Sequence, residues 1–286
     1  MASYRFCRSD DVPLLVRAHN ECFHPPGGVD PVDRDGFKWW IRALELWTSS
    51  CMVATEGTRL IGVLLAAKRE NESCVLAVGV HPDFRHLDHG RHMVTSLSQK
   101  LAILGPPRIR AEVPSGNERF REFLEHCDYT VRRSHTDYAL EPPFVESTLP
   151  KEMVAEIDLD ELAGAGFSEI ATELPWGRQP RSIARRHEYF ATVRVLALAG
   201  GDRFEAALVT DENDPARRKI LAVHHAGDER AIALAGRLLR YYASTGRTPV
   251  VWERVHESEC PAARAVGWGL ASGEETLLLD TTAIPA

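Results

Sequence analysis

The stretch from Val78 to Met93 combines residue types in an order that suits binding of a phosphorylated ligand. An apolar run of β type ends at His81-Pro82, and a short loop then leads into a helix start near His89. The first N–H groups of a helix have no partner inside the helix, so they attract anions. The spacing therefore predicts an anion-binding loop between the strand and the helix.

Hydrophobic periodicity and turn residues predict the elements that position this loop. In the first half we expect a strand, two helices, three strands, a helix, a strand, a helix and a closing strand, over residues 4–8, 11–22, 33–47, 51–55, 60–67, 74–80, 89–104, 108–113, 117–127 and 131–140. This order predicts an α/β (α+β) fold in which a mixed, mainly antiparallel sheet is flanked by helices.

The second half repeats this order at an offset of about 140 residues. Strands and helices are expected there over residues 193–199, 204–209, 219–224, 229–244, 249–255, 260–266 and 275–280. Glu112 and Glu253 hold the same place in the two halves, and Glu141-Pro142-Pro143 has the composition of a linker. We predict two tandem units, residues 1–141 and 150–286, although the order is also compatible with one sheet shared by both halves.

Composition excludes several classes of protein. The chain is 44% hydrophobic and 26% charged, as globular domains are. Its net charge of -7 opposes a general role in nucleic-acid binding. The longest apolar run, residues 60–67, is too short to span a membrane, and the N-terminal residues lack a signal-peptide core. Six scattered cysteines without a C-x-x-C pair indicate a reduced, cytoplasmic setting. We expect neither nucleic acid nor membrane as a partner.

Val80-His81-Pro82, followed by Arg85-His86-Leu87-Asp88-His89-Gly90, resembles the V-x-P and R/Q-x-x-G-x-G/A motifs of the GNAT acetyltransferase superfamily. The resemblance covers residues 3–140, whereas residues 150–282 match only in the order of elements. It implies acetyl-CoA as the acyl donor, with the pyrophosphate on backbone N–H groups of residues 85–90 and the pantetheine arm along residues 78–80. The implied cofactor-binding residues are Val78, Gly79, Val80, Arg85, His86, Leu87, Asp88, His89, Gly90, Arg91 and Asn117.

The same resemblance implies that Glu112 is the catalytic general base. An ammonium acceptor must lose a proton before its nitrogen attacks a thioester, and a carboxylate within reach can accept that proton. An ordinary role for Glu112 as a strand residue stays open. Asn117 matches a cofactor-contacting position, but helix N-capping explains an asparagine there equally well.

Three positions depart from the family's pattern. Asp88 replaces the first glycine of the phosphate cradle, where its carboxylate would repel pyrophosphate. Leu124 replaces the tyrosine that would protonate the departing thiolate, and Asp128-Tyr129 replaces a Gly-aromatic pair. The segment 224–230 of the second half lacks the motif, so we expect no acetyl-CoA there. That half would wall the acceptor cleft, support the first half or form the interface of a homodimer.

Other chemistry is disfavoured. His81, His86, His89 and His92 crowd together with Asp88, but they coincide with the cofactor loop and no cysteine joins them, so we expect no metal. Cys74 has no identifiable His–acid partner and is expected in the core. The tryptophans near the expected acceptor pocket have the spacing of core residues or of substrate contacts: Trp39, Trp40 and Trp47.

The sequence thus predicts a tandem GNAT-like N-acetyltransferase. Its first unit would transfer an acetyl group from acetyl-CoA to a primary amine of a small molecule or peptide, by direct attack in a ternary complex. The alternative is a catalytically weak or inactive CoA-binding sensor or assembly module. An acyltransferase for longer acyl chains differs only in pocket size, and the acceptor stays open.

Overall fold

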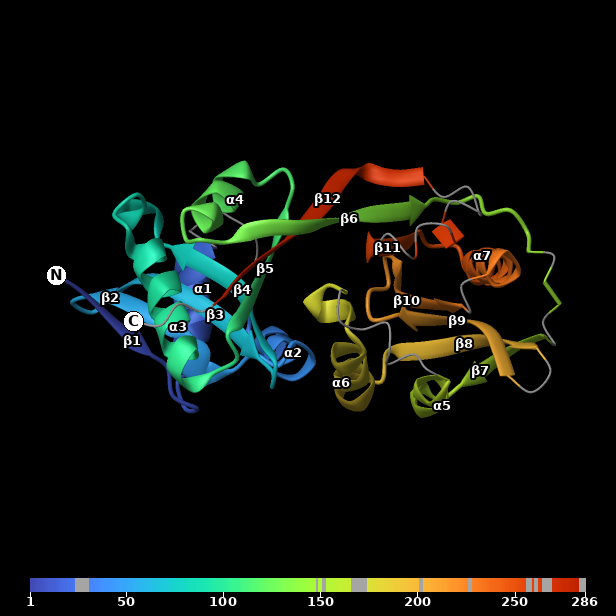
Figure 1. Ribbon diagram of the computed structural model, residues 1–286, viewed down its shortest axis with the longest axis horizontal. Coiled ribbons are helices and arrows are strands. Elements are labelled where there is room, and N and C mark those ends of the chain that lie inside the picture. Colours follow the sequence, from blue (N-terminus) through green and yellow to red (C-terminus); the bar gives the residue numbers. More distant parts are fainter. Residues whose placement is uncertain are drawn as a thin grey trace. The chain divides into compact units, whose positions relative to one another are not determined.

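The computed structural model describes residues 1–23, 31–147, 149–150, 153–165, 174–200, 203–225, 228–255, 259, 262–263 and 269–282. Contacts within the chain define two compact units. Unit 1 consists of residues 1–133 and 277–286, and unit 2 consists of residues 134–276. The predicted α/β class, with tandem units of mixed, mainly antiparallel sheet flanked by helices, is confirmed (Figure 1).

The strands of unit 1 follow the order β1-β2-β3-β4-β5-β12 within a single 12-stranded sheet. The neighbours from β1 to β4 pair antiparallel, whereas β4 and β5 pair parallel. Its strands are β1 (Ala2–Phe6), β2 (Met52–Glu56), β3 (Arg59–Lys68), β4 (Glu72–Val80), β5 (Arg108–Pro114), the start of β6 (Thr130–Leu140) and the end of β12 (Gly269–Thr282). Its helices are α1 (Val12–Phe23), α2 (Arg34–Ala43), η1 (Thr48–Ser50), η2 (Pro82–Phe84), α3 (His89–Leu104) and α4 (Glu118–Glu125).

Alternating side chains give this sheet two apolar faces. On one face, Ile109, Ala111 and Val113 of β5 pack with Met93 and Leu97 of α3. The other face carries α1 and α2, through a cluster that includes Leu15, Ala18, Phe37, Val63 and Leu65. The predicted helix over 33–47 ends early, because Glu45 adopts a φ of 56° and so leaves the right-handed helix.

Unit 2 repeats the sheet order as β7-β8-β9-β10-β11-β6. In unit 2, β10 and β11 pair parallel, whereas β6–β11, β9–β10, β8–β9 and β7–β8 pair antiparallel. Its elements are β7 (Val154–Ile157), α5 (Leu159–Gly164), η5 (Trp176–Arg178), α6 (Pro180–Phe190), β8 (Val193–Gly200), β9 (Arg203–Asp211), β10 (Arg218–His225), α7 (Glu229–Ser244) and β11 (Val250–Val255). Of the predicted helix over 260–266, only residues 262 and 263 lie within the described residues.

In each unit, the last strand of this order is not the one that chain order suggests. Residues 136–140 of β6 pair antiparallel with β11 of unit 2, from Leu140↔Val250 to Thr136↔Val255. Beside β5 of unit 1 lies β12, whose residues from Leu277 onward belong to that unit. The contact units therefore run differently from the predicted segments 1–141 and 150–286. Strand pairing joins residues far apart in sequence, which a linear repeat does not reveal.

Candidate active site

The parallel pair β4–β5 opens part of the way along its length. Its paired residues run from Glu72↔Arg108 to Val75↔Ala111, although β4 continues to Val80. Leu76 is an extra residue in the pairing with β3, since Leu65 faces Ala77 and Ala66 faces Val75. Such a bulge bends a strand and increases its twist. The edge of β4 toward β5 is therefore open from residue 76 to residue 80.

The loop after this strand has two residues in the left-handed region. His86 has a φ of 63° and Asp88 a φ of 59°. Asp is one of the few residues besides glycine that adopts this conformation at modest cost. Within the described loop, the Asp88 side chain makes no capping hydrogen bond to the start of α3. The N–H groups of that first helical turn are thus left to a ligand or to water.

Side chains hold the turn before this loop against the sheet. Arg85 Nε donates to the Val80 carbonyl oxygen over 3.0 Å. Arg59 donates to Asp83 over 2.6 Å, which lowers the pKa of that carboxyl, and its guanidinium lies 4.9 Å from the Phe84 ring centroid. These contacts tie the η2 turn to the β2–β3 hairpin and to the end of β4.

The first turn of α3 is anchored by its histidines. Tyr4 Oη and His89 Nδ1 are 2.5 Å apart, and the rings of Tyr4 and His92 lie 4.0 Å apart. A Cβ on Gly90 would lie 3.2 Å from Phe123 Cε2, so the glycine lets α3 approach α4 closely. These two histidines therefore pack against β1. Among the described residues, no group of three or more His, Cys, Asp or Glu is arranged to hold a metal ion.

Glu112 follows Ala111, the last paired residue of β5, and so stands where the strand pair opens. Its neighbours Ala111 and Val113 belong to the core on the α3 face, so Glu112 belongs to the opposite face. Cys74 is fully buried; burial raises the pKa of its thiol well above the ordinary value, and the Glu112 charge raises it further. A thiol held protonated in this way is a poor nucleophile.

The structure separates the remaining predicted residues by role. Asn117 caps α4, since its side chain accepts from the Phe120 N–H over 3.2 Å. Leu124 and Tyr129 are buried in the α3-side core, and burial raises the pKa of Tyr129. The predicted cofactor residues lie on β4, in the loop after η2 and in the first turn of α3: Val78, Gly79, Val80, Arg85, His86, Leu87, Asp88, His89, Gly90 and Arg91.

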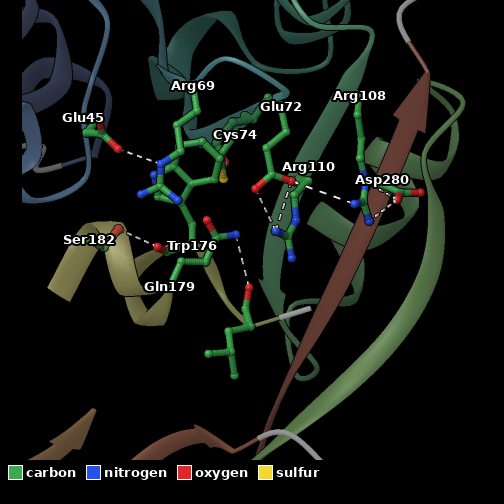
Figure 2. Close-up of polar contacts among 12 residues, drawn as sticks. Glu45, Arg69, Glu72, Cys74, Arg108, Arg110, Trp176, Gln179, Ser182 and Asp280 are labelled. Atoms are coloured by element: carbon green, nitrogen blue, oxygen red, sulfur yellow. Dashed lines mark hydrogen bonds and ion pairs between the residues drawn. The ribbon is translucent and has the colours of Figure 1, made fainter. Parts of the chain in front are cut away.

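The sequence analysis missed a chain of ion pairs along β4, β5 and β12 (Figure 2). Arg110, almost fully buried, donates to Glu72 over 3.2 Å, and Arg108 Nε donates to Asp280 over 3.1 Å. In the left part of Figure 2, Arg69 Nε donates to Glu45 over 2.6 Å. Charged residues at alternating positions of otherwise apolar strands could have indicated that Glu72, Arg108 and Arg110 form ion pairs. No local sequence pattern indicates that Asp280 is their partner.

Residues 12–129 match the model of the acetyltransferase (GNAT) family. Over this segment the chain is similar to the GNAT acetyltransferases. A curated relative, "Acetyltransferase plu1384" of Photorhabdus laumondii subsp. laumondii, is 26% identical over 133 residues, which are 46% of this chain and 89% of the relative. Acetyl transfer is the activity common to both names.

Solved structures share the fold over the whole chain. A GCN5-related N-acetyltransferase from Sphaerobacter thermophilus has a TM-score of 0.65 at 16% identity, covering 100% of this chain and 96% of that one. Another from Kribbella flavida has a TM-score of 0.68 at 12% identity, covering 99% and 71%. A tandem GNAT protein from the clavulanic acid biosynthesis pathway has a TM-score of 0.64 at 13% identity and covers 100% of both chains.

Proposed function

We propose that unit 1 binds acetyl-CoA at the opening of β4–β5 and transfers its acetyl group to a primary amine. The observation that carries this proposal is the opening itself, which begins at the Leu76 bulge and leads to the α3 N-terminus. Backbone groups on an open strand edge bind an extended ligand with amide groups, as pantetheine has. The helix start suits the pyrophosphate.

The backbone of this loop fits acetyl-CoA, but one negatively charged side chain opposes its binding. Gly90 allows the close approach of α3 to α4, and residues 86 and 88 have the backbone conformation that a tight phosphate loop needs. The Asp88 carboxylate opposes an anionic ligand, and Arg85 and Arg91 offset part of that repulsion. We therefore expect binding that is weaker than the same loop would give with a neutral residue at position 88.

Glu112 is our proposed general base. Acetyl-CoA supplies an activated thioester when bound. The Glu112 carboxylate, directly or through water, takes the proton from the acceptor ammonium, so that the nitrogen lone pair becomes free to form the amide bond. Direct attack in a ternary complex needs no acyl-enzyme, and the buried Cys74 thiol supports this route.

The departing thiolate has no tyrosine at the family's usual place, because Leu124 lies in the core. A thiol pKa of about 8.5 makes departure without protonation tolerable. A non-catalytic CoA-binding module is the second candidate function, and Asp88 together with Leu124 favours it. A donor with a longer acyl chain differs from acetyl-CoA only in the room it needs beside Glu112.

The acceptor in this proposal is a small-molecule or peptide amine. Unit 2 would support unit 1 or contribute the interface of a homodimer. Five described cysteines are free thiols, which supports the expected cytoplasmic location. No helix in the described part of the chain has the length and apolarity needed to cross a membrane.

Calorimetry with acetyl-CoA, followed by an assay of CoA release over a panel of amines, tests this function. We expect binding and amine-dependent release of CoA. An absence of binding at millimolar acetyl-CoA would refute both candidate functions. Binding without turnover on any amine would favour the non-catalytic CoA-binding module. A preference for a longer acyl-CoA in the same assay would show that the donor is not acetyl-CoA.

A further inference from the structure

Unit 2 contains the same kind of strand opening as unit 1. The parallel residues of β10–β11 run from Arg218↔Val250 to Ile220↔Trp252, although β10 continues to His225. In the pairing with β9, Ile220 faces Thr210 and Ala222 faces Val209, so Leu221 is the extra residue. The bulge directly follows the last parallel pair, as Leu76 does in unit 1.

A single side chain bridges this second opening. Arg178 Nε donates to the Leu221 carbonyl oxygen over 2.6 Å, and Arg178 Nη1 donates to the Arg254 carbonyl oxygen over 2.5 Å. The two acceptors lie on β10 and β11, the strands on either side of the opening. Arg178 Nη2 donates to both oxygens of Glu259, over 2.7 and 2.9 Å. Only 6% of each of these two charged side chains is exposed.

The segment that carries Arg178 is held in place by its own contacts. Its backbone N–H donates to the Pro175 carbonyl over 2.8 Å, and Ser182 Oγ donates to the Trp176 carbonyl over 2.6 Å (Figure 2). On the strand side, the Arg254 N–H donates to Asp137 over 2.5 Å, and Arg254 has a φ of 56°. That peptide is therefore turned out of the regular ladder.

We infer that Arg178 is an internal occupant of the second opening, in the place that acetyl-CoA takes in unit 1 under the proposed function. A guanidinium has donors in a fixed fork, so one side chain satisfies a carbonyl on each strand together with a carboxylate. Glu253, the counterpart of Glu112, forms an ion pair with Lys219, whose Nζ lies 3.1 Å from the carboxylate. Unit 2 is thus a permanently closed copy of the fold that binds no acyl-CoA. The comparison with unit 1 rests on the proposed function, but the bridge itself does not.

Thermal unfolding of the full chain tests the bridge. Arg178→Ala removes the guanidinium donors from the buried Glu259 carboxylate and from two strand carbonyls, so we expect the unfolding midpoint to fall by about 5–15 °C. The matched control is Arg194→Ala, which removes an arginine of the same unit whose ion pairs are exposed. Equal midpoints for the two variants would overturn the inference. If Arg178→Ala does not fold, Arg178→Lys decides: a lowered midpoint supports the forked bridge and an unchanged one refutes it.

Chemical rescue separates an occupied opening from general loss of packing. Low-millimolar methylguanidinium chloride, compared with sodium chloride at equal ionic strength, should raise the midpoint of Arg178→Ala but not that of Arg194→Ala or the unmodified chain. No selective rise would overturn the role as an occupant. Calorimetry adds a separate readout, since we expect one acetyl-CoA per chain and two would refute closure. No binding at all would refute the proposed function, while the unfolding and rescue results would still decide the bridge.

Discussion

Asp280 accepts a hydrogen bond from Arg108 Nε over 3.1 Å, although 172 positions separate the two residues. The other oxygen of the same carboxylate accepts from Arg132 Nε over 2.5 Å. Asp280 is 7% exposed, so these charges act in partly desolvated surroundings. The carboxylate thereby fastens the end of β12 to β5 and to the first residues of β6 within unit 1.

Removal of this charge should destabilise the chain. We expect Asp280→Asn to lower the free energy of unfolding by about 1.5–3 kcal/mol, the range for hydrogen bonds to charged groups. Urea denaturation followed by circular dichroism measures the change. Glu156→Gln serves as the control, since its ion pair with Arg194 is exposed and should contribute at most about 1 kcal/mol. Equal losses in the free energy of unfolding for the two variants would show that Asp280 contributes no more than an exposed ion pair does.

Glu112→Gln should remove the proposed base and keep the shape of the side chain. We expect kcat/KM for the amine to fall by about 10²–10⁴-fold, while the affinity for acetyl-CoA stays near that of the unmodified chain. Steady-state kinetics and calorimetry give the two readouts. Glu122→Gln on the exposed side of α4 should leave both unchanged. A Glu112→Gln variant with full activity would retire the assignment.

Asp88 offers a gain-of-affinity test. Asp88→Asn removes the charge but keeps a residue that tolerates a positive φ. An exposed pair of like charges about 4 Å apart costs about 1 kcal/mol, so we expect acetyl-CoA to bind about fivefold more tightly, with less benefit at high salt. Calorimetry at two salt concentrations measures this. Asp88→Ala removes the same charge but places alanine at a positive φ, so we expect a smaller gain in affinity. Weaker binding of acetyl-CoA by Asp88→Asn would contradict the proposed repulsion between Asp88 and the pyrophosphate.

Gly79 is required by packing. A Cβ at this position would lie 2.5 Å from Phe23 Cε2 and 2.9 Å from Cys22 Cβ, where α1 crosses β4. We expect Gly79→Ala to lower the free energy of unfolding by about 1–3 kcal/mol, as overpacking does. Gly116→Ala is the matched control, because a Cβ there meets nothing within 4 Å. Denaturant midpoints compare the two variants. Equal stability would show that α1 can shift away from β4 with no loss in the free energy of unfolding.

Two histidines on β10 should make stability depend on pH. Burial lowers the pKa of both His224 and His225 below the ordinary value of 6.5. The unfolded chain then binds more protons than the folded chain near and below that pH, so stability is greatest above about 6.5 and falls as the pH drops. We expect His224→Gln/His225→Gln to show a shallower loss of urea midpoint between pH 7 and pH 5. Parallel curves would contradict this prediction.

Much of the site's frame was predictable because its signals are local. The strand before His81, the Pro82 turn and the helix over 89–104 follow from apolar spacing and from turn residues that act within a few positions. The structure confirms that helix as His89–Leu104. The residue contacts within the site were less accessible. Sequence alone allows Asn117 either a cofactor contact or a helix cap, and the structure shows that its side chain caps α4.

The sequence by itself determined most elements of unit 1, the strands and the helix of unit 2 from β8 to β11, the motif that resembles the GNAT family's and the departures at Asp88 and Leu124, whereas it did not reveal β7, α5 or α6. Only the tertiary structure decided that β12 lies beside β5, that Asp280 joins Arg108, and that Arg178 bridges β10 and β11. Hydrophobic periodicity can be seen in neighbouring residues, because the geometry of each strand or helix decides which of its side chains face the core. Partnership between distant strands depends on which edges are free when the sheets assemble, and no local pattern carries that information.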